Sequence, residues 1–196
     1  MKFVVVILLV VIVFAGVALI VVVKRGLSSR EQPTLTEEII ARAVRHLATP
    51  VSMRQARNPV PLTSDVLAEA RAHWADHCAT CHGNDGRGQT DIGRNLYPKA
   101  PDMRSERTQD LTDGELFSII KNGVRLTGMP AWGDPAGHDD TDNWKLVHFI
   151  RHLPKITPDE LEEMKSMNPV SPMEIKEKKE EEQFLEGGQA PPHHHH

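Results

Sequence analysis

One stretch limits the fold of this chain more than any other: residues Phe3 to Val23 are 21 consecutive side chains without a charged or polar group. A helix of that length, at about 1.5 Å per residue, spans roughly 31 Å, close to the hydrocarbon thickness of a bilayer. A cleaved signal peptide, the alternative, usually has an apolar region of only about 7–15 residues. The small residues Ala15 and Ala18 also lie inside the run rather than at its polar end. We therefore expect an uncleaved transmembrane helix that contacts the lipid bilayer through residues 3–23.

The remainder of the chain has the composition of a soluble protein and carries most of its charge. Of the 196 residues, 23 are Lys or Arg and 27 are Asp or Glu, for a formal net charge of -4. No basic tract is interleaved with aromatic residues, so the sequence predicts no nucleic-acid binding. Two cysteines cannot form a disulfide framework, and we find no internal repeat, phosphate-binding glycine loop or nucleophile elbow.

Capping residues followed by apolar residues at helical spacing predict helices and almost no strands. The expected helices begin near Thr34, at Thr63 or Ser64, near Thr112, at Thr141 or Asp142, at Thr157-Pro158 and at Ser171-Pro172. The first ends near Thr49-Pro50, the third at Asn122-Gly123 and the fourth before Pro154.

Two segments between these helices lack helical periodicity. Residues 50–63 are rich in proline and are expected to form an extended strap. Residues 83–111 contain six glycines and prolines, and a loop that long in a compact domain usually surrounds something. The compact part has only about 90 residues and three helices. A domain of that size has a small hydrophobic core and usually needs extra stabilisation, such as a disulfide or a bound group. We therefore expect an all-α domain around a large apolar cofactor. The predicted organisation is an anchor (1–25), a helix and Pro-rich linker (26–63), the domain (64–154) and a charged helical or disordered extension (155–196).

The two cysteines of the chain lie in the stretch "DHCATCHGNDGRG", as Cys78 and Cys81 followed by His82. A redox dithiol would be expected near alternating strands and helices, which are not predicted. A structural zinc site needs a fourth ligand, for which His73 and His77 are available, although the adjacent second cysteine and histidine make tetrahedral closure awkward. The spacing C-x-x-C-H is typical of covalent haem c attachment, with thioethers at both cysteines and the histidine as proximal iron ligand.

A methionine in a rigid loop strengthens this interpretation. Met129 lies in "NGVRLTGMPAWG" between Gly128 and Pro130, which fix its backbone in a turn. Most methionines fill hydrophobic cores rather than bind metals, and Met103 in "APDM" is the alternative ligand.

The segment 64–154 resembles a class I monohaem cytochrome c. The resemblance rests on "CATCHG" (78–83), "NLYPKAPDM" (95–103), "ELFSIIKNGV" (115–124), "GMPAW" (128–132) and "WKLVHFIRHL" (144–153). The lead-in "NPVP" (58–61) is similar to bacterial membrane-tethered members of the family. The resemblance implies one covalently bound haem c, with His82 as proximal and Met129 as distal ligand and with Trp132 and the 95–101 loop beside the haem. Ala70 stands where the family often has glycine at the crossing of the first and last helices, followed by Trp74 and facing Leu146 and Phe149.

The resemblance also implies a function and a location. With both axial positions filled, no open site remains for bond chemistry, so we expect an electron carrier rather than an enzyme. The expected partners are membrane redox complexes or other electron-transfer proteins. The alternatives are a monohaem subunit of a multi-subunit membrane oxidoreductase, with the 34–48 helix and the tail as docking elements, and a ligand sensor with a labile Met129.

Two topology signals disagree. Lys2 precedes the apolar run, whereas Lys24, Arg25 and Arg30 follow it, which weakly favours a cytoplasmic domain. The resemblance implies haem attachment outside the cytoplasmic membrane. We therefore expect a single-pass protein of the bacterial inner membrane with its haem domain on the periplasmic side.

The C-terminal extension carries two less specific features. The charge run "EIKEKKEEE" at 174–182 is expected to be a solvated helix face or a disordered tail, or else a docking element for a basic partner. The residues His193 to His196 are either the remnant of a purification tag or a natural metal-binding end.

Overall fold

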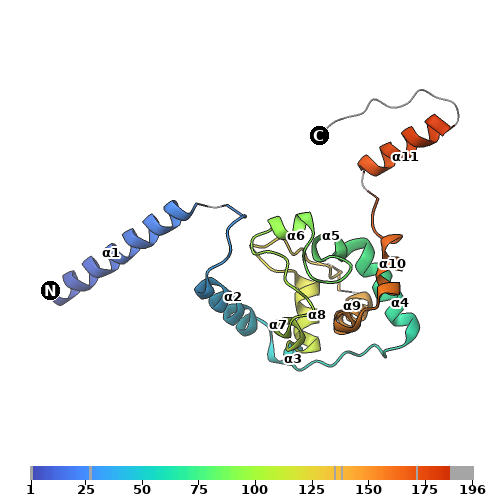
Figure 1. Cartoon of the computed structure of the whole chain (residues 1–196). Coiled ribbons are helices and arrows are strands. Elements are labelled where there is room, and N and C mark those ends of the chain that lie inside the picture. The colour runs from blue at the N-terminus through green and yellow to red at the C-terminus, as the bar shows by residue number, and fades with distance from the viewer. Residues whose placement is uncertain (1, 27, 135, 138, 171, 186–196) are drawn as a thin grey trace.

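The computed structural model describes residues 2–26, 28–134, 136–137, 139–170 and 172–185, and all regular structure in these ranges is helical (Figure 1). The elements are α1 (Lys2–Arg25), α2 (Leu35–Ala48), α3 (Val51–Arg54), α4 (Ser64–His73), the π-helical turn η1 (Trp74–Cys78), α5 (Ala79–His82), α6 (Asp91–Asn95), α7 (Glu106–Gln109), α8 (Asp113–Asn122), α9 (Thr141–His152), the 3-10 turn η2 (Leu153–Lys155), α10 (Pro158–Lys165) and α11 (Pro172–Leu185). The predicted all-α fold is confirmed. His193 to His196 lie outside the described residues.

The predicted helix starts are largely confirmed by their caps. The side chains of Thr34, Thr112 and Thr157 each accept a hydrogen bond from the backbone N–H three residues on, and the glutamate there completes a capping box. Thr63 caps α4 by accepting from the N–H of Val66. Helix α9 begins at Thr141 itself, and α11 begins at Pro172.

The segment 50–63 was expected to be extended throughout, but its first part is helical. Residues Val51–Arg54 form the short helix α3, with Pro50 at its N-cap position. A proline there costs no hydrogen bond, because the first backbone N–H groups of a helix have no intrahelical partner. The other prolines of the segment, Pro59 and Pro61, follow this turn, and there the chain is extended as expected.

The hydrophobic core forms where α4 and its continuation η1 pack on α9. Ala70 and Trp74 from the first helix and Leu146 and Phe149 from the last are almost completely buried. The Trp74 and Phe149 rings have centroids 5.5 Å apart. Each large apolar side chain buried in this way stabilises the fold by roughly 1.5–3 kcal/mol. The predicted apolar face of the last helix is therefore confirmed, and Ala70 lies at the crossing.

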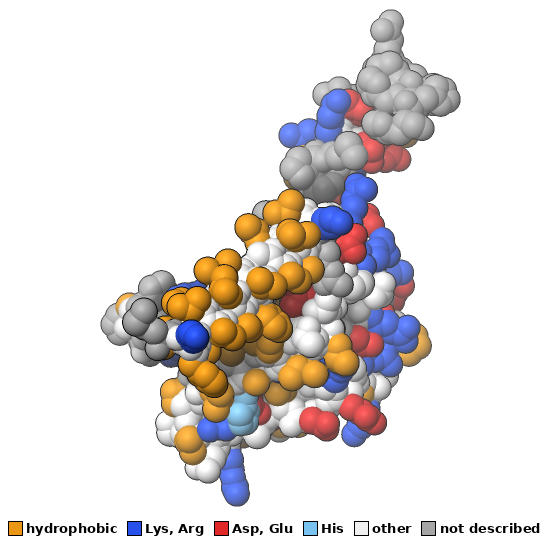
Figure 2. Space-filling view, turned by 90° about the vertical axis from the view of Figure 1, so that its left-hand side faces the viewer, with side chains coloured by type: hydrophobic (Ala, Val, Ile, Leu, Met, Phe, Trp, Pro, Cys, Tyr) orange, Lys and Arg blue, Asp and Glu red, His pale blue; other side chains and the backbone are white. Residues whose placement is uncertain are grey.

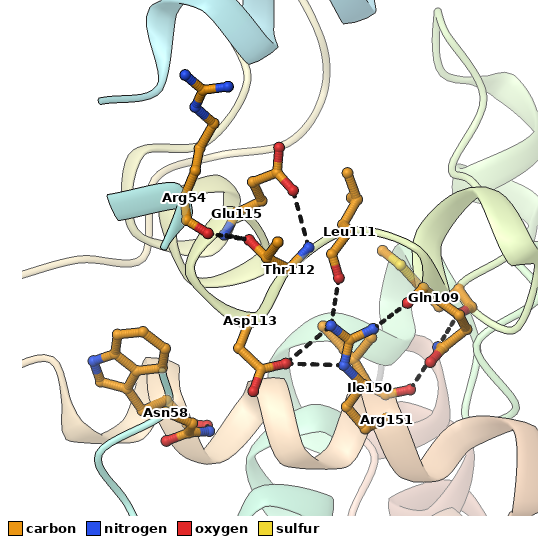
Figure 3. A network of polar contacts seen from close by, with 11 residues as sticks. Arg54, Asn58, Gln109, Leu111, Thr112, Asp113, Glu115, Ile150 and Arg151 are labelled. Atoms are coloured by element: carbon orange, nitrogen blue, oxygen red, sulfur yellow. Dashed lines mark hydrogen bonds and ion pairs between the residues drawn. The ribbon is translucent and has the colours of Figure 1, made fainter. Parts of the chain in front are cut away.

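Arg151 ties the end of the long 83–111 loop to α9 (Figure 3). Its guanidinium donates to the backbone oxygens of Gln109 and Leu111 and to Asp113 Oδ1, the last at 2.9 and 3.0 Å. The Gln109 side chain in turn donates to the Ile150 backbone oxygen at 2.9 Å. One charged side chain thus satisfies two backbone oxygens of a segment with little regular structure.

The C-terminal extension starts as part of the domain and then leaves it. In α10, Met164 is fully buried, and Glu160 forms ion pairs with Arg71 and His152. Helix α11 projects from the domain in Figure 1, and the described part of its charge run is mostly exposed. The prediction of a solvated helix face over residues 174–182 therefore fits α11.

At the other end of the chain, α1 is long and apolar enough to cross a membrane, and none of that span is buried within the protein. Its 24 residues extend about 36 Å at the helical rise of about 1.5 Å per residue. Such a helix is compatible with a single-pass membrane anchor.

Candidate functional site

The two cysteines and His82 lie at the end of a helix that changes its winding just before them. After α4 ends at His73, the chain forms one π-helical turn, in which the N–H of Ala79 bonds to the oxygen of Trp74. The α-helical turn α5 then carries Cys81 and His82. The sequence pattern predicted one uninterrupted helix. A π turn only adds one residue to a helical turn, and no particular residue type marks it in a sequence. Single π turns are often found at functional sites.

The two thiols are free and poorly suited to redox exchange. Both cysteines are partly buried and unbridged. Burial, and to a lesser extent the neighbouring Cys81, raise the pKa of Cys78 to about 12, and burial also raises the pKa of Cys81. A dithiol catalyst needs the opposite shift, because the thiolate is the nucleophile. This finding argues against the dithiol interpretation.

His82 is a buried imidazole close to the Pro101 carbonyl. The side chain is only 7% exposed, and burial lowers its pKa to about 4, partly offset by the Pro101 carbonyl. Its Nδ1 atom is fully buried and has no hydrogen bond of good geometry within the described part of the chain. A neutral buried imidazole is the form that binds a metal.

The 83–111 loop folds back onto the cysteine segment through backbone oxygens. The N–H of Gly88 bonds to the His82 oxygen at 2.7 Å, and the Thr90 hydroxyl donates to the Cys81 oxygen at 3.1 Å. The indole N–H of Trp74 donates to the Gly83 oxygen at 3.0 Å. Every residue from Cys81 to Gly83 thus has its carbonyl held, which fixes the backbone that carries His82.

Met129 lies in a tight loop that is anchored on the end of α8. The N–H of Val124 bonds to the Met129 oxygen at 3.1 Å, and the Met129 N–H bonds to the Thr127 hydroxyl at 3.1 Å. Further along, the N–H of Trp132 bonds to the Ile120 oxygen at 3.0 Å. The loop therefore holds the backbone on both sides of Met129, as expected from its flanking glycine and proline.

Packing distinguishes Met129 from the other methionines whose side chains are described. Met164 is fully buried in the core, and Met53, Met103 and Met167 pack against the core while partly buried. Met129 is partly buried but is not part of that core packing. A thioether held in a loop and left outside the core is available as a ligand. This contrast favours Met129 over Met103.

Ring and loop contacts bring the Met129 loop to the other predicted site segments. The rings of Trp132 and His77 are stacked with centroids 5.3 Å apart, and His77 directly precedes Cys78. On the other side, a Cβ on Gly128 would meet the Leu96 side chain at 2.6 Å, so the 95–101 loop lies against the Gly-Met-Pro turn. The segments that carry the predicted site residues therefore converge.

The structure also shows supporting residues that sequence reasoning missed. The side-chain amides of Asn84 and Asn168 bond to each other at 2.8 and 2.9 Å, and Asn168 also donates to the Ala75 oxygen at 2.9 Å. This pair fastens the end of α10 to the cysteine helix. A polar pair 84 residues apart has no local sequence signal.

The zinc interpretation finds no support in the arrangement of the side chains. The described residues contain no group of three or more His, Cys, Asp and Glu side chains that could hold a metal ion. His73 and His77 instead form an edge-to-face ring pair with centroids 5.1 Å apart. A buried neutral imidazole, a loop thioether and two free thiols about one helical turn apart are the groups that a covalently bound haem requires. The residues present therefore fit that group.

Comparison with known proteins agrees with this set of groups. Residues 65–150 match the model of the family described as "Cytochrome C oxidase, cbb3-type, subunit III". The match begins in α4 and ends in α9, so it contains both crossing helices, the cysteine segment and the Met129 loop. No curated protein matches the chain.

Proposed function

We propose, from the premise that residues 65–150 form a c-type cytochrome domain, that this chain transfers single electrons through one covalently bound haem c. Cys78 and Cys81 would hold the haem by thioether bonds, with His82 and Met129 as axial ligands. When bound, the haem iron supplies a reversible one-electron couple, whose potential a methionine ligand raises. The observation that carries the proposal is the buried, neutral His82 imidazole at the end of the C-x-x-C-H helix.

In this proposal, the residues of the chain hold the two ligand side chains in place and do not make or break covalent bonds in a substrate. The held carbonyls of residues 81–83 fix the backbone that carries His82, and the anchored 123–133 loop supports a thioether at a fixed place. If His82 and Met129 both bind the iron, no site would remain on it for a substrate. An electron carrier rather than an enzyme is therefore the proposed role, as is typical of the family.

The proposed location is a bilayer crossed once by α1, with residue 24 onward outside the cytoplasm. The apolar length of α1 supports the anchor. The resemblance implies that haem is attached outside the cytoplasmic membrane, which supports the proposed side of the membrane for the haem domain.

A stable subunit of a membrane oxidoreductase is the second candidate. The family description, which names a subunit of an oxidase, favours it. The exposed charged helix α11 offers a surface for a partner. The expected partners in either case are membrane redox complexes or other electron-transfer proteins. Purification of the full chain from native membranes in mild detergent separates the two: stoichiometric companion chains indicate a subunit, and a single chain indicates a carrier.

The covalent haem is tested on the full chain produced with a haem-attachment system. The denatured polypeptide is expected to keep the mass of one haem through acid-acetone extraction and to show a reduced visible spectrum typical of haem c. A matched variant, Cys78→Ala with Cys81→Ala, is expected to lose the haem in the same extraction. A wild-type chain free of haem after extraction would overturn the proposal, and two haem masses would overturn the single site.

A further inference from the structure

Helix α2 lies on the cytochrome domain with its polar face inward. Glu38 Oε2 is 3.0 Å from a guanidinium nitrogen of Arg107, and His46 Nδ1 is 3.0 Å from Glu115 Oε1. Arg54 also bonds to His46. These contacts join the charged side of α2 to α3, α7 and α8. Burial raises the pKa of Glu115, but hydrogen bonds from Thr112 and His46 outweigh it and lower the pKa, so the carboxylate stays charged.

The apolar side of the same helix faces away from the domain and is uncovered within the described residues. Ile40 is 63% exposed and Leu47 79%, and no residue of α2 is buried. At 100° per residue these side chains share one face, opposite Glu38 and Arg45. Val44 shares this face, and Ile39 lies at its margin; both side chains are exposed. A surface helix of a soluble domain shows the reverse arrangement, with its apolar stripe on the core.

The position of α2 in the chain indicates what covers this face. Only residues 26–34 separate the end of α1 from α2. Nine residues reach at most about 30 Å when fully extended, so α2 stays near the membrane surface that α1 leaves. Figure 2 looks onto the side from which α1 projects, and the hydrophobic side chains in its foreground include those of α1.

The charge of this part of the chain agrees with a lipid surface. Residues 24–34, which join α1 to α2, contain three Lys and Arg against one Glu, although the whole chain has a net charge of -4. Basic residues beside an amphipathic helix add attraction to anionic headgroups.

We propose that α2 lies in the membrane interface, with the face formed by Ile40, Val44 and Leu47, and Ile39 at its margin, in an anionic bilayer surface. Its ion pair to Arg107 of α7 and its hydrogen bond to Glu115 of α8 then hold the cytochrome domain in one orientation on the membrane. The helix acts as a second attachment point that fixes the angle of the domain, whereas α1 alone would leave it free to swing. This inference rests on the proposed anchoring by α1.

The test uses the full chain in nanodiscs that contain anionic lipid. Thioether formation consumes Cys78 and Cys81, so an introduced cysteine is the one thiol left for a spin label. Labels at Ile40→Cys and Val44→Cys are expected to collide with oxygen more than with a water-soluble nickel complex. The control Gln55→Cys, an exposed site directly after α3, is expected to show the reverse, and Val11→Cys reports whether α1 is inserted.

Each outcome decides the proposal. A lipid-embedded Val11 label with nickel-accessible Ile40 and Val44 labels overturns it while leaving the anchor intact. A nickel-accessible Val11 label shows that the anchoring itself fails, and the inference falls with it. Protection of α2 in native membranes but not in pure lipid assigns its cover to another protein and overturns the bilayer assignment. As a second variant, Ile40→Asp with Val44→Asp is expected to expose a Leu47→Cys label while the haem spectrum is retained.

Discussion

Gly93 shows how closely the backbone is packed around the candidate haem segment. A Cβ at this position would lie 2.2 Å from the Cys81 backbone oxygen and 2.6 Å from the Gly88 oxygen. Neither atom can move independently, because the Thr90 hydroxyl also donates to the Cys81 oxygen. Glycine is required here for space rather than for an unusual backbone angle.

Replacement of this glycine is therefore expected to be costly. Gly93→Ala should lower the free energy of unfolding by about 1–3 kcal/mol, the usual range for overpacking a close contact. Gly128→Ala is the matched control, because its Cβ would meet only the Leu96 side chain, which can move. Chemical denaturation of both variants measures the difference. Equal losses would show that the contact with Cys81 is not rigid.

The two candidate methionine ligands should respond differently to truncation. Met129→Ala is expected to abolish the weak sulfur-to-iron charge-transfer band of the ferric protein and to lower the midpoint potential, because methionine ligation favours ferrous iron. Met103→Ala, the control, should keep the band and lose stability instead, since Met103 packs against the core. Visible spectra and a redox titration decide the matter. Loss of the band in Met103→Ala alone would reverse the ligand assignment.

At the scale of elements, α9 organises the loop as well as the core. One side of α9 buries Leu146 and Phe149 against α4 and η1, and Arg151 near its end holds the 109–113 segment. A planar guanidinium suits this role because it presents several donors in fixed directions.

A lysine cannot reproduce that geometry, so Arg151→Lys is expected to destabilise the protein by about 2–3 kcal/mol through unsatisfied backbone oxygens. Arg94→Lys, which changes an exposed pair with Asp91, should cost under about 0.5 kcal/mol. Thermal or denaturant unfolding measures both. A small effect at Arg151 would mean that water replaces the lost donors.

The junction of α10 with the first helix predicts a pH dependence. Burial alone would raise the pKa of Glu160, but hydrogen bonds from His152 and from Thr157 outweigh it and lower the pKa from its ordinary 4.5 to about 2. A carboxylate with a lowered folded-state pKa contributes stability that is present above pH 4.5 and lost as the pH falls toward 2. Glu160→Gln should flatten the fall in stability over this range, whereas the exposed Glu162→Gln should not. An unchanged slope in Glu160→Gln would remove Glu160 from the acid transition.

Features that depend on residues close in sequence could be predicted, and features that depend on contacts between distant segments could not. Helix starts set by a threonine and a glutamate three residues later were predictable, because both partners are local, as at Thr112 and Glu115. The site segments were predictable because their residue types have specific chemistry. The π turn at Trp74–Cys78 and the Asn84–Asn168 pair were not, because each depends on how distant segments meet.

At the scale of the whole molecule, the chain combines an apolar helix, a cytochrome domain and a charged tail, and their topology is open to direct measurement. Protease added to spheroplasts is expected to digest the haem domain while cytoplasmic markers stay intact. A protected domain would overturn the proposed side of the membrane and weaken the haem assignment. A mature chain that begins near residues 16–26 and is free in the periplasm would overturn only the anchor.

Residues far along the chain hold the cysteine helix in place, so these residues are synthesised well after the cysteines. Phe149 and Asn168 cover or hold that helix, yet they follow Cys78 by about 70 and 90 residues. At about 5–20 residues per second of synthesis, the cysteines precede their covering by roughly 4–18 s. Cysteines that end up partly buried are therefore openly accessible during that interval, and it is then, before the domain closes, that a large planar group can reach both of them unhindered.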